Sequence, residues 1–144
     1  MAVMDSGEEA VVRKLGFKIL ADLTDVPFLG SVHVTTETFM RKNADVVKKY
    51  MRGIVKTLKF IWAKPEQTKV VLKKLYRETD DVVAAERYKA LVKFFPAVPY
   101  VTEDAVSVIL DILREKGELK KRVEPSEFLN VGFLREAAEV EKTK

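Results

Sequence analysis

The spacing of apolar residues divides the chain into a β-rich first quarter and a long helical remainder. Residues 17–23 carry apolar side chains at every second position, a period that is typical of a strand. Residues 31–35 form a second β-rich run, and residues 1–4 are an apolar stub with strand character. Beyond residue 36 the apolar positions recur every three or four residues, which predicts helices almost to the end of the chain.

Residues that start and stop helices set the expected boundaries. Ser6 is the predicted N-cap of a short helix that ends at Lys14, with Glu9 as its capping-box partner and Gly16 as its left-handed stop. The residues expected to begin the later helices are Thr36, Asn43, Pro65, Thr79, Thr102 and Pro125. Gly117 should end the penultimate helix, the last helix should cover residues 125–138 with an interruption near Gly132, and residues 141–144 should fray.

Composition places the chain among globular proteins. It has 144 residues, 47% of them hydrophobic and 33% charged, which favours one compact domain over disorder. No apolar run is long enough to cross a bilayer, so we expect no direct membrane insertion, and no secretory signal follows Met1. The absence of cysteine excludes disulfides, thiolate metal sites and cysteine nucleophiles.

Few residues could carry catalysis. His33 is the only histidine and lies in the second β-rich run, where a polar-face position explains it without chemistry. The carboxylate pairs Glu8-Glu9 and Asp80-Asp81 fall in predicted first helical turns, where the helix dipole stabilises negative charge. No phosphate-binding or dinucleotide-binding glycine motif is present. We therefore expect no catalytic residue, no metal site and no cofactor.

The net charge of +4 leaves nucleic-acid binding open without requiring it. Lysines and arginines follow one side of the long helix that begins after Asn43. The aromatic residues of that helix fall with its apolar positions instead, so a solvated basic face is the simpler interpretation and nucleic acid is not an expected partner.

One turn has the parts of a small-ligand site. Asp5, Ser6 and Gly7 join the first apolar stub to the short helix, so a hydroxyl and free backbone N–H groups meet there. An ordinary strand-to-helix turn capped by Ser6 explains the same residues. The layout around it is unbalanced, because two or three strands precede five or six helices. Such a small sheet is marginal alone, which predicts a fragment of a larger sheet.

Five motifs, in order, resemble a known family. They are residues 16–23 (GFKILADL), 32–36 (VHVTT), 42–48 (KNADVVK), 99–105 (PYVTEDA) and 125–130 (PSEFLN). Together they resemble the substrate-binding proteins of nitrate/sulfonate/taurine-type ABC importers, a superfamily that also includes thiamine-pyrimidine-precursor synthase-like proteins. The similarity covers nearly the whole chain, and the order of the motifs carries more weight than any one of them.

The resemblance implies a helix-rich α/β chain that is part of a periplasmic binding protein type II fold. Residues 1–144 would then be the C-terminal portion of a two-lobed protein. Residues 1–35 would hold crossover strands and a short helix, and residues 36–144 the helical part of lobe one. The full-length protein would be periplasmic, or it would be an extracellular protein associated with the membrane.

By position in the family, the implied ligand-binding residues are Asp5, Ser6, Gly7, Glu8, Phe28, Gly30 and Ser31. They would bind a small polar or anionic organic solute for delivery to the ABC permease subunits in the membrane. The turn at Asp5 departs from the aromatic-Glu-Pro or Pro-Pro turn of some members, which leaves the solute open. A basic helical module that binds nucleic acid or protein and a precursor-synthase-like enzyme are the alternatives, although the enzyme branch uses a cysteine-rich motif that this chain lacks.

Overall fold

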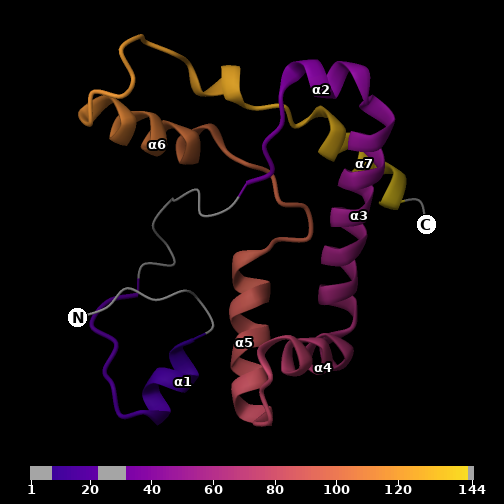
Figure 1. Ribbon diagram of the computed structural model, residues 1–144. Helices are drawn as coiled ribbons and strands as arrows, with labels where there is room; N and C mark the ends of the chain where they lie inside the picture. The colour runs from indigo at the N-terminus through magenta and orange to yellow at the C-terminus, as the bar shows by residue number, and fades with distance from the viewer. Residues whose placement is uncertain (1–7, 23–31, 143–144) are drawn as a thin grey trace. The chain divides into compact units, whose positions relative to one another are not determined.

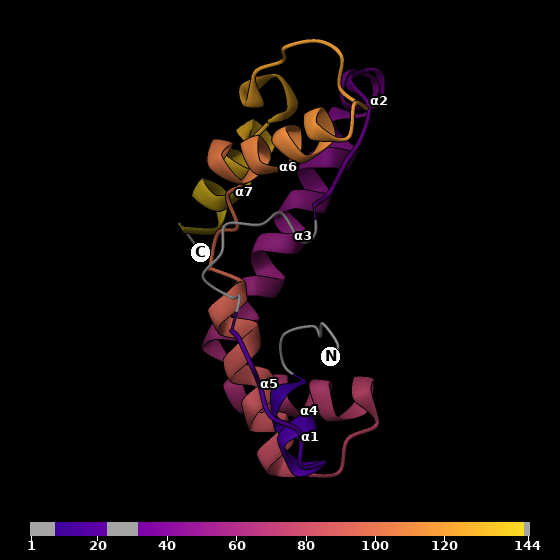
Figure 2. The same ribbon diagram turned by 90° about the vertical axis from the view of Figure 1, so that its left-hand side faces the viewer.

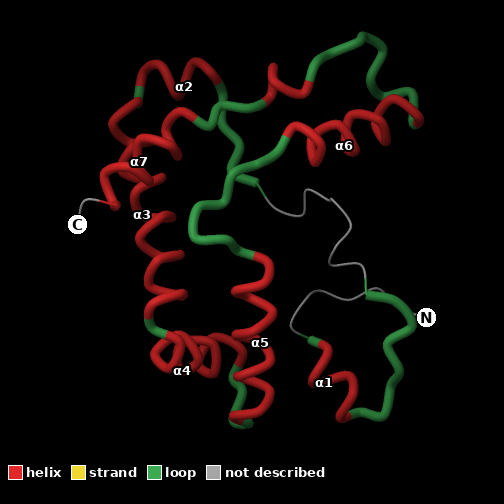
Figure 3. The backbone as a smooth tube through the Cα atoms, turned by 180° about the vertical axis from the view of Figure 1, so that it is seen from behind, coloured by secondary structure: helices red, strands yellow, loops and turns green. Residues whose placement is uncertain are grey.

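The computed structural model describes residues 8–22 and 32–142 (Figure 1). Within these residues every regular element is helical, and Figure 3 colours none of them as strand. The elements are α1 (Glu9–Lys14), α2 (Glu37–Lys42), α3 (Ala44–Ala63), α4 (Pro65–Tyr76), α5 (Asp81–Phe94), α6 (Glu103–Glu115), the 3₁₀ helix η1 (Pro125–Phe128) and α7 (Gly132–Lys142). The helix-rich character predicted from the sequence is confirmed.

The predicted strands are not seen in the described residues. Residues 17–22 and 32–35 have no regular secondary structure. A strand exists only when its backbone N–H and C=O groups pair with a neighbouring strand, and neither run has such a neighbour in the described part of the chain. Their apolar side chains are exposed: Phe17 by 65%, Leu20 by 80% and Val34 by 86%. Residue 23 and the run at residues 1–4 lie outside the described residues.

Most predicted helix starts coincide with the observed ones. The Thr36 hydroxyl accepts the Phe39 N–H at 3.1 Å, and the Thr102 hydroxyl accepts the Ala105 N–H at 3.3 Å, so both residues are N-caps. Pro65 occupies the first turn of α4, where its missing N–H costs nothing. Asn43 ends α2, and its carbonyl accepts the N–H groups of the first turn of α3.

Three boundary predictions need correction. The cap of α5 is Asp80, not Thr79, because the Asp80 carboxylate reaches the N–H groups of the first turn. The N-cap of α1 is Glu8, which makes no side-chain cap, and Ser6 lies outside the described residues. A separate 3₁₀ turn precedes α7, which begins at Gly132, where the sequence predicts an interruption. Because α7 continues to Lys142, the prediction that residues 141 and 142 fray is wrong.

Left-handed residues end three of the helices. Gly16 (φ +82°) and Gly117 (φ +72°) follow α1 and α6, as predicted. In both turns the N–H of the residue after the glycine bonds back to the carbonyl five residues earlier, which is the Schellman arrangement. Arg77 (φ 53°) plays the same part after α4, and it is the only non-glycine residue with positive φ in the described residues. A side chain at that position costs free energy that glycine would not.

The described residues form two compact units, one made of residues 8–22 and 56–97 and the other of residues 32–55 and 98–142. In the first unit α5 packs against both α1 and α4 (Figure 2). Its buried side chains include Leu58 of α3, Leu72 of α4 and Val83 of α5. Hydrogen bonds join the end of α3 to α5: the Trp62 indole N–H donates to the Phe95 carbonyl at 2.9 Å, and the Tyr88 hydroxyl donates to the Ile61 carbonyl at 3.1 Å.

In the second unit the first part of α3 packs against α7. Val55, fully buried, meets Leu134 and Ala137, and Met51 and Val98 cover them. Ion pairs flank this core, Lys48 with Glu136 at 3.0 Å and Arg52 with Glu141 at 3.5 Å. The Glu141 side chain is only 6% exposed, and the packing of α7 accounts for helix that persists to its end. Separately, η1 packs against α6.

Candidate functional site

The described residues include one of the seven predicted ligand-binding residues. Asp5, Ser6, Gly7, Phe28, Gly30 and Ser31 lie outside the described residues. Glu8 is described, at the N-terminal end of α1 in the first unit. Glu8 is therefore the one predicted ligand-binding residue whose contacts the structure describes.

The Glu8 carboxylate faces the guanidinium of Arg87 on α5. Arg87 Nη1 donates to Glu8 Oε1 at 2.6 Å, and Nη2 donates to Oε2 at 3.1 Å. Two parallel N–H···O bonds from a planar guanidinium to a planar carboxylate make a specific and strong ionic contact. The Arg87 side chain is 10% exposed and that of Glu8 is 34% exposed, so solvent screens this pair less than it screens a surface pair.

A tyrosine ring supports the same guanidinium. The Arg87 Cζ atom lies 4.2 Å from the centroid of the Tyr76 ring at the end of α4, a cation–π distance. The Arg87 Nε is buried and has no hydrogen-bond partner. Hydrogen bonding to Glu8 raises the pKa of Arg87 above its ordinary value, against the opposing effect of burial. Arg87 is therefore a fixed, desolvated cation held between a carboxylate and an aromatic face.

A second ionic contact joins α1 to α5. Lys14, in the last turn of α1, forms an ion pair with Asp80, the N-cap of α5. The hydrogen bond from Lys14, together with those from the Val82 and Val83 N–H groups, lowers the pKa of Asp80. No residue of α1 is buried. Two ionic contacts, one at each end of α1, therefore add to the packing that attaches α1 to α5.

Sequence reasoning missed Arg87, although a signal for it exists. Val83 and Ala84 are the buried residues of α5, and Arg87 follows them by four and three positions. Residues at those separations share one face of a helix. A charged residue on the apolar face of an amphipathic helix needs an opposite charge or a ligand there, since an isolated buried charge is costly.

The single histidine takes part in a local contact. His33 Nδ1 lies 2.8 Å from the Tyr50 hydroxyl, and the two rings meet edge to face with centroids 5.2 Å apart. Both residues are exposed. The contact holds residue 33 to α3 within the second unit.

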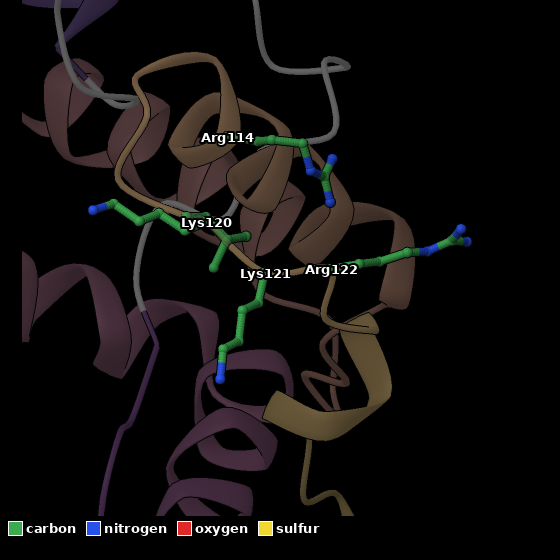
Figure 4. Close-up of a pocket in the computed structure, with 5 residues that line it drawn as sticks. Arg114, Lys120, Lys121 and Arg122 are labelled. Atoms are coloured by element: carbon green, nitrogen blue, oxygen red, sulfur yellow. The ribbon is translucent and has the colours of Figure 1, made fainter.

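The last turn of α6 and the loop after it carry a cluster of cations. An open hollow of about 520 Å³ is lined by Leu119 and by four cations, Arg114, Lys120, Lys121 and Arg122 (Figure 4). In Figure 4 Arg114 and Arg122 extend toward one side, while Lys120 and Lys121 extend away from them and from each other, so the four charged ends do not converge on one point. Arg114 pairs with Asp111, and Arg122 Nε bonds Glu124 at 3.3 Å. This hollow lacks the converging donors that a small anion requires.

A second open groove, of about 600 Å³, lies in the same unit, between α2 and the segment from η1 to α7. Its apolar lining includes Met40, Leu129 and Phe133, and polar side chains such as Glu37 and Asn130 also line it. Asn130 is already engaged, because its Oδ1 accepts the Gly132 N–H at 3.2 Å.

The described residues contain no group of three or more His, Cys, Asp or Glu side chains that could hold a metal ion. Among the same residues, no helix is both long and apolar enough to cross a membrane. Comparison with known proteins finds no family model, no curated protein and no solved structure that matches the chain.

Proposed function

We propose that the chain is part of a solute-binding protein of the nitrate/sulfonate/taurine type of ABC importer. It would bind a small polar or anionic organic solute for delivery to the permease, from the periplasm or the outer face of the cell. The five ordered motifs between residues 16 and 130 support this proposal.

The observation that carries the proposal is that each of the two β-patterned segments exposes apolar side chains. Among the described residues, Phe17, Leu20, Val32 and Val34 are all exposed by 42% or more, and all lie in residues 17–22 or 32–35. An extended segment that exposes large apolar side chains is a surface that a partner strand can cover. Strands from another part of a larger sheet would pair with these segments and cover those side chains.

The first alternative, a basic nucleic-acid-binding helix, loses support from the ion pairs of α3. Lys48 and Arg52 contact acidic residues of α7, so neither is an uncommitted cation. Counterion release from nucleic acid requires lysines and arginines that are free to meet phosphates. The enzyme alternative depends on His33, whose Nδ1 faces the Tyr50 hydroxyl.

Isothermal titration calorimetry of the chain tests the proposal. The panel contains nitrate, taurine, short alkanesulfonates and a phosphorylated pyrimidine, with chloride as the control anion and duplex DNA as the opposing ligand. We expect saturable heat with one of the organic or oxyanionic solutes and none with chloride. The affinity should be weak, since a chain that supplies part of a two-lobed cleft closes on its solute incompletely.

Binding to DNA that weakens steeply with added salt, with no response to any solute, would contradict the importer function and favour the basic module. Turnover of the phosphorylated pyrimidine that disappears in His33→Ala would favour the enzyme instead.

A further inference from the structure

The contact between Glu8 and Arg87 has the geometry of an anion complex. The guanidinium donates two hydrogen bonds to one carboxylate, lies over a tyrosine ring and is largely shielded from solvent, which is how proteins recognise an oxyanion with two acceptor oxygens. Here the carboxylate belongs to the chain itself, from a residue 79 positions away in sequence.

We propose that Arg87 is an anion-recognition residue and that Glu8 occupies its anion position as an internal competitor. A small carboxylate, sulfonate or nitrate would replace the Glu8 carboxylate on the two terminal nitrogens of Arg87. The inference deepens the proposed function and rests on it for the class of solute, since it names the residue that meets the negative charge.

Displacement of Glu8 is feasible because α1 is weakly held. None of its six residues is fully buried, and two ion pairs join it to α5, Glu8 with Arg87 and Lys14 with Asp80. A helix this short has little stability of its own. Loss of the Glu8 contact should therefore loosen α1 while α4 and α5 keep their buried residues.

Arg87 itself should stay in place when Glu8 leaves. It is on a 14-residue helix, next to the buried Val83 and Ala84, and the Tyr76 ring supports its guanidinium independently of Glu8. A cation so little exposed cannot remain unpaired without cost, and an oxyanion from solution relieves that cost.

Hydrogen exchange of the chain, read by mass spectrometry over residues 9–14, tests the inference. Acetate, methanesulfonate and nitrate are titrated against chloride at constant ionic strength. We expect a saturable increase of about fivefold in the exchange of these amides with the oxyanions, the change that loss of about 1 kcal/mol of ion pairing produces. Chloride should give no such increase.

Three variants make the test specific. Arg87→Gln should exchange rapidly at residues 9–14 without any oxyanion and respond to none. Glu8→Gln keeps Arg87 and should bind the same oxyanion more tightly than the native chain, because the competitor is gone. Asp80→Asn is the matched control: it weakens the other contact of α1 and should leave the oxyanion response intact.

The inference would be overturned if amide exchange at residues 9–14 rose equally with chloride and with the oxyanions. It would also be overturned if Arg87→Gln responded to the oxyanions as the native chain does. Neither result contradicts the proposed function if calorimetry finds a solute, because that solute would then bind at a site other than Arg87. An oxyanion response without any solute binding would leave Arg87 as an anion site and remove the importer function.

Discussion

Single polar side chains decide where α5 begins and how α1 is attached to it. The Asp80 carboxylate accepts hydrogen bonds from the Val82 N–H at 2.7 Å and the Val83 N–H at 3.3 Å. It also accepts a hydrogen bond from the Lys14 ammonium group. One carboxylate thus caps a helix and pairs with a cation on a neighbouring helix. All three donors favour its charged form, which is why the pKa of Asp80 is lowered.

A lowered pKa in the folded state makes stability depend on pH in a defined direction. Asp80 stabilises the fold above the pKa of an unfolded aspartate, about 3.9, and that contribution is lost as pH falls through its lower folded value. In Asp80→Asn the amide oxygen can still cap α5 but carries no charge. We expect urea denaturation at pH 7 to give a higher free energy of unfolding for the native chain than for Asp80→Asn. The difference between the two should shrink below about pH 4.

The source of that pH dependence can be separated by a second substitution. Lys14→Gln removes the largest cause of the shift and leaves the two backbone donors in place. Its stability should therefore depend less on pH between about 4 and 2 than that of the native chain. A difference between native chain and Asp80→Asn that stays constant down to pH 2 would show that Asp80 is not the group responsible.

At the scale of elements, glycine has opposite effects in the interior and at the end of a helix. Gly53 lies in the middle of α3, is exposed, and has no atom within 4 Å of the place where a Cβ would stand. Gly117 has φ +72° after α6 and equally open surroundings. The space around both positions is the same, so backbone conformation alone distinguishes them.

Alanine substitutions should therefore change stability in opposite directions. Gly53→Ala should raise the free energy of unfolding by about 0.5–1 kcal/mol, because alanine loses less backbone freedom in a helix. Gly117→Ala should lower it by about 1 kcal/mol, because a Cβ is strained at positive φ. Thermal unfolding followed by circular dichroism measures both. A loss of stability in Gly53→Ala would mean that this face of α3 is covered in solution.

The sequence predicts helices of this chain better than it predicts what they contact. Thr36, Thr102, Pro65 and Gly117 are recognisable because each acts on its own few residues of backbone. The choice of Asp80 over Thr79 depends on which side chain reaches the first turn, and neighbouring cap residues are hard to separate by pattern.

Long-range pairs are beyond a one-dimensional pattern. The sequence predicts Glu8 as a carboxylate in the first turn of a helix, and only the fold brings it to Arg87. The two β-patterned runs raise the reverse difficulty: their alternation predicts strands, yet a strand depends on a partner that the pattern does not contain. Of the candidate site, the sequence therefore identifies Glu8 but not the cation that binds it.

At the scale of the whole molecule, two separate sets of buried residues stabilise the described helices. Val55, Leu134 and Ala137 form a cluster in the second unit, and Val83 and Leu72 are buried in the first. Residues 44–55 of α3 belong to the second unit and residues 56–63 to the first. Substitutions in one core should therefore act first on the helices packed around it.

Val55→Ala and Val83→Ala form a matched pair for this expectation, since both side chains are almost fully buried. Each should cost about 2 kcal/mol from lost burial and the cavity left behind. Hydrogen exchange should then locate the damage: faster exchange in α7 for Val55→Ala, and in α4 and α5 for Val83→Ala, because these helices contact the altered core. If either substitution speeds exchange equally in α4, α5 and α7, the two cores unfold together and α3 couples them into one cooperative structure.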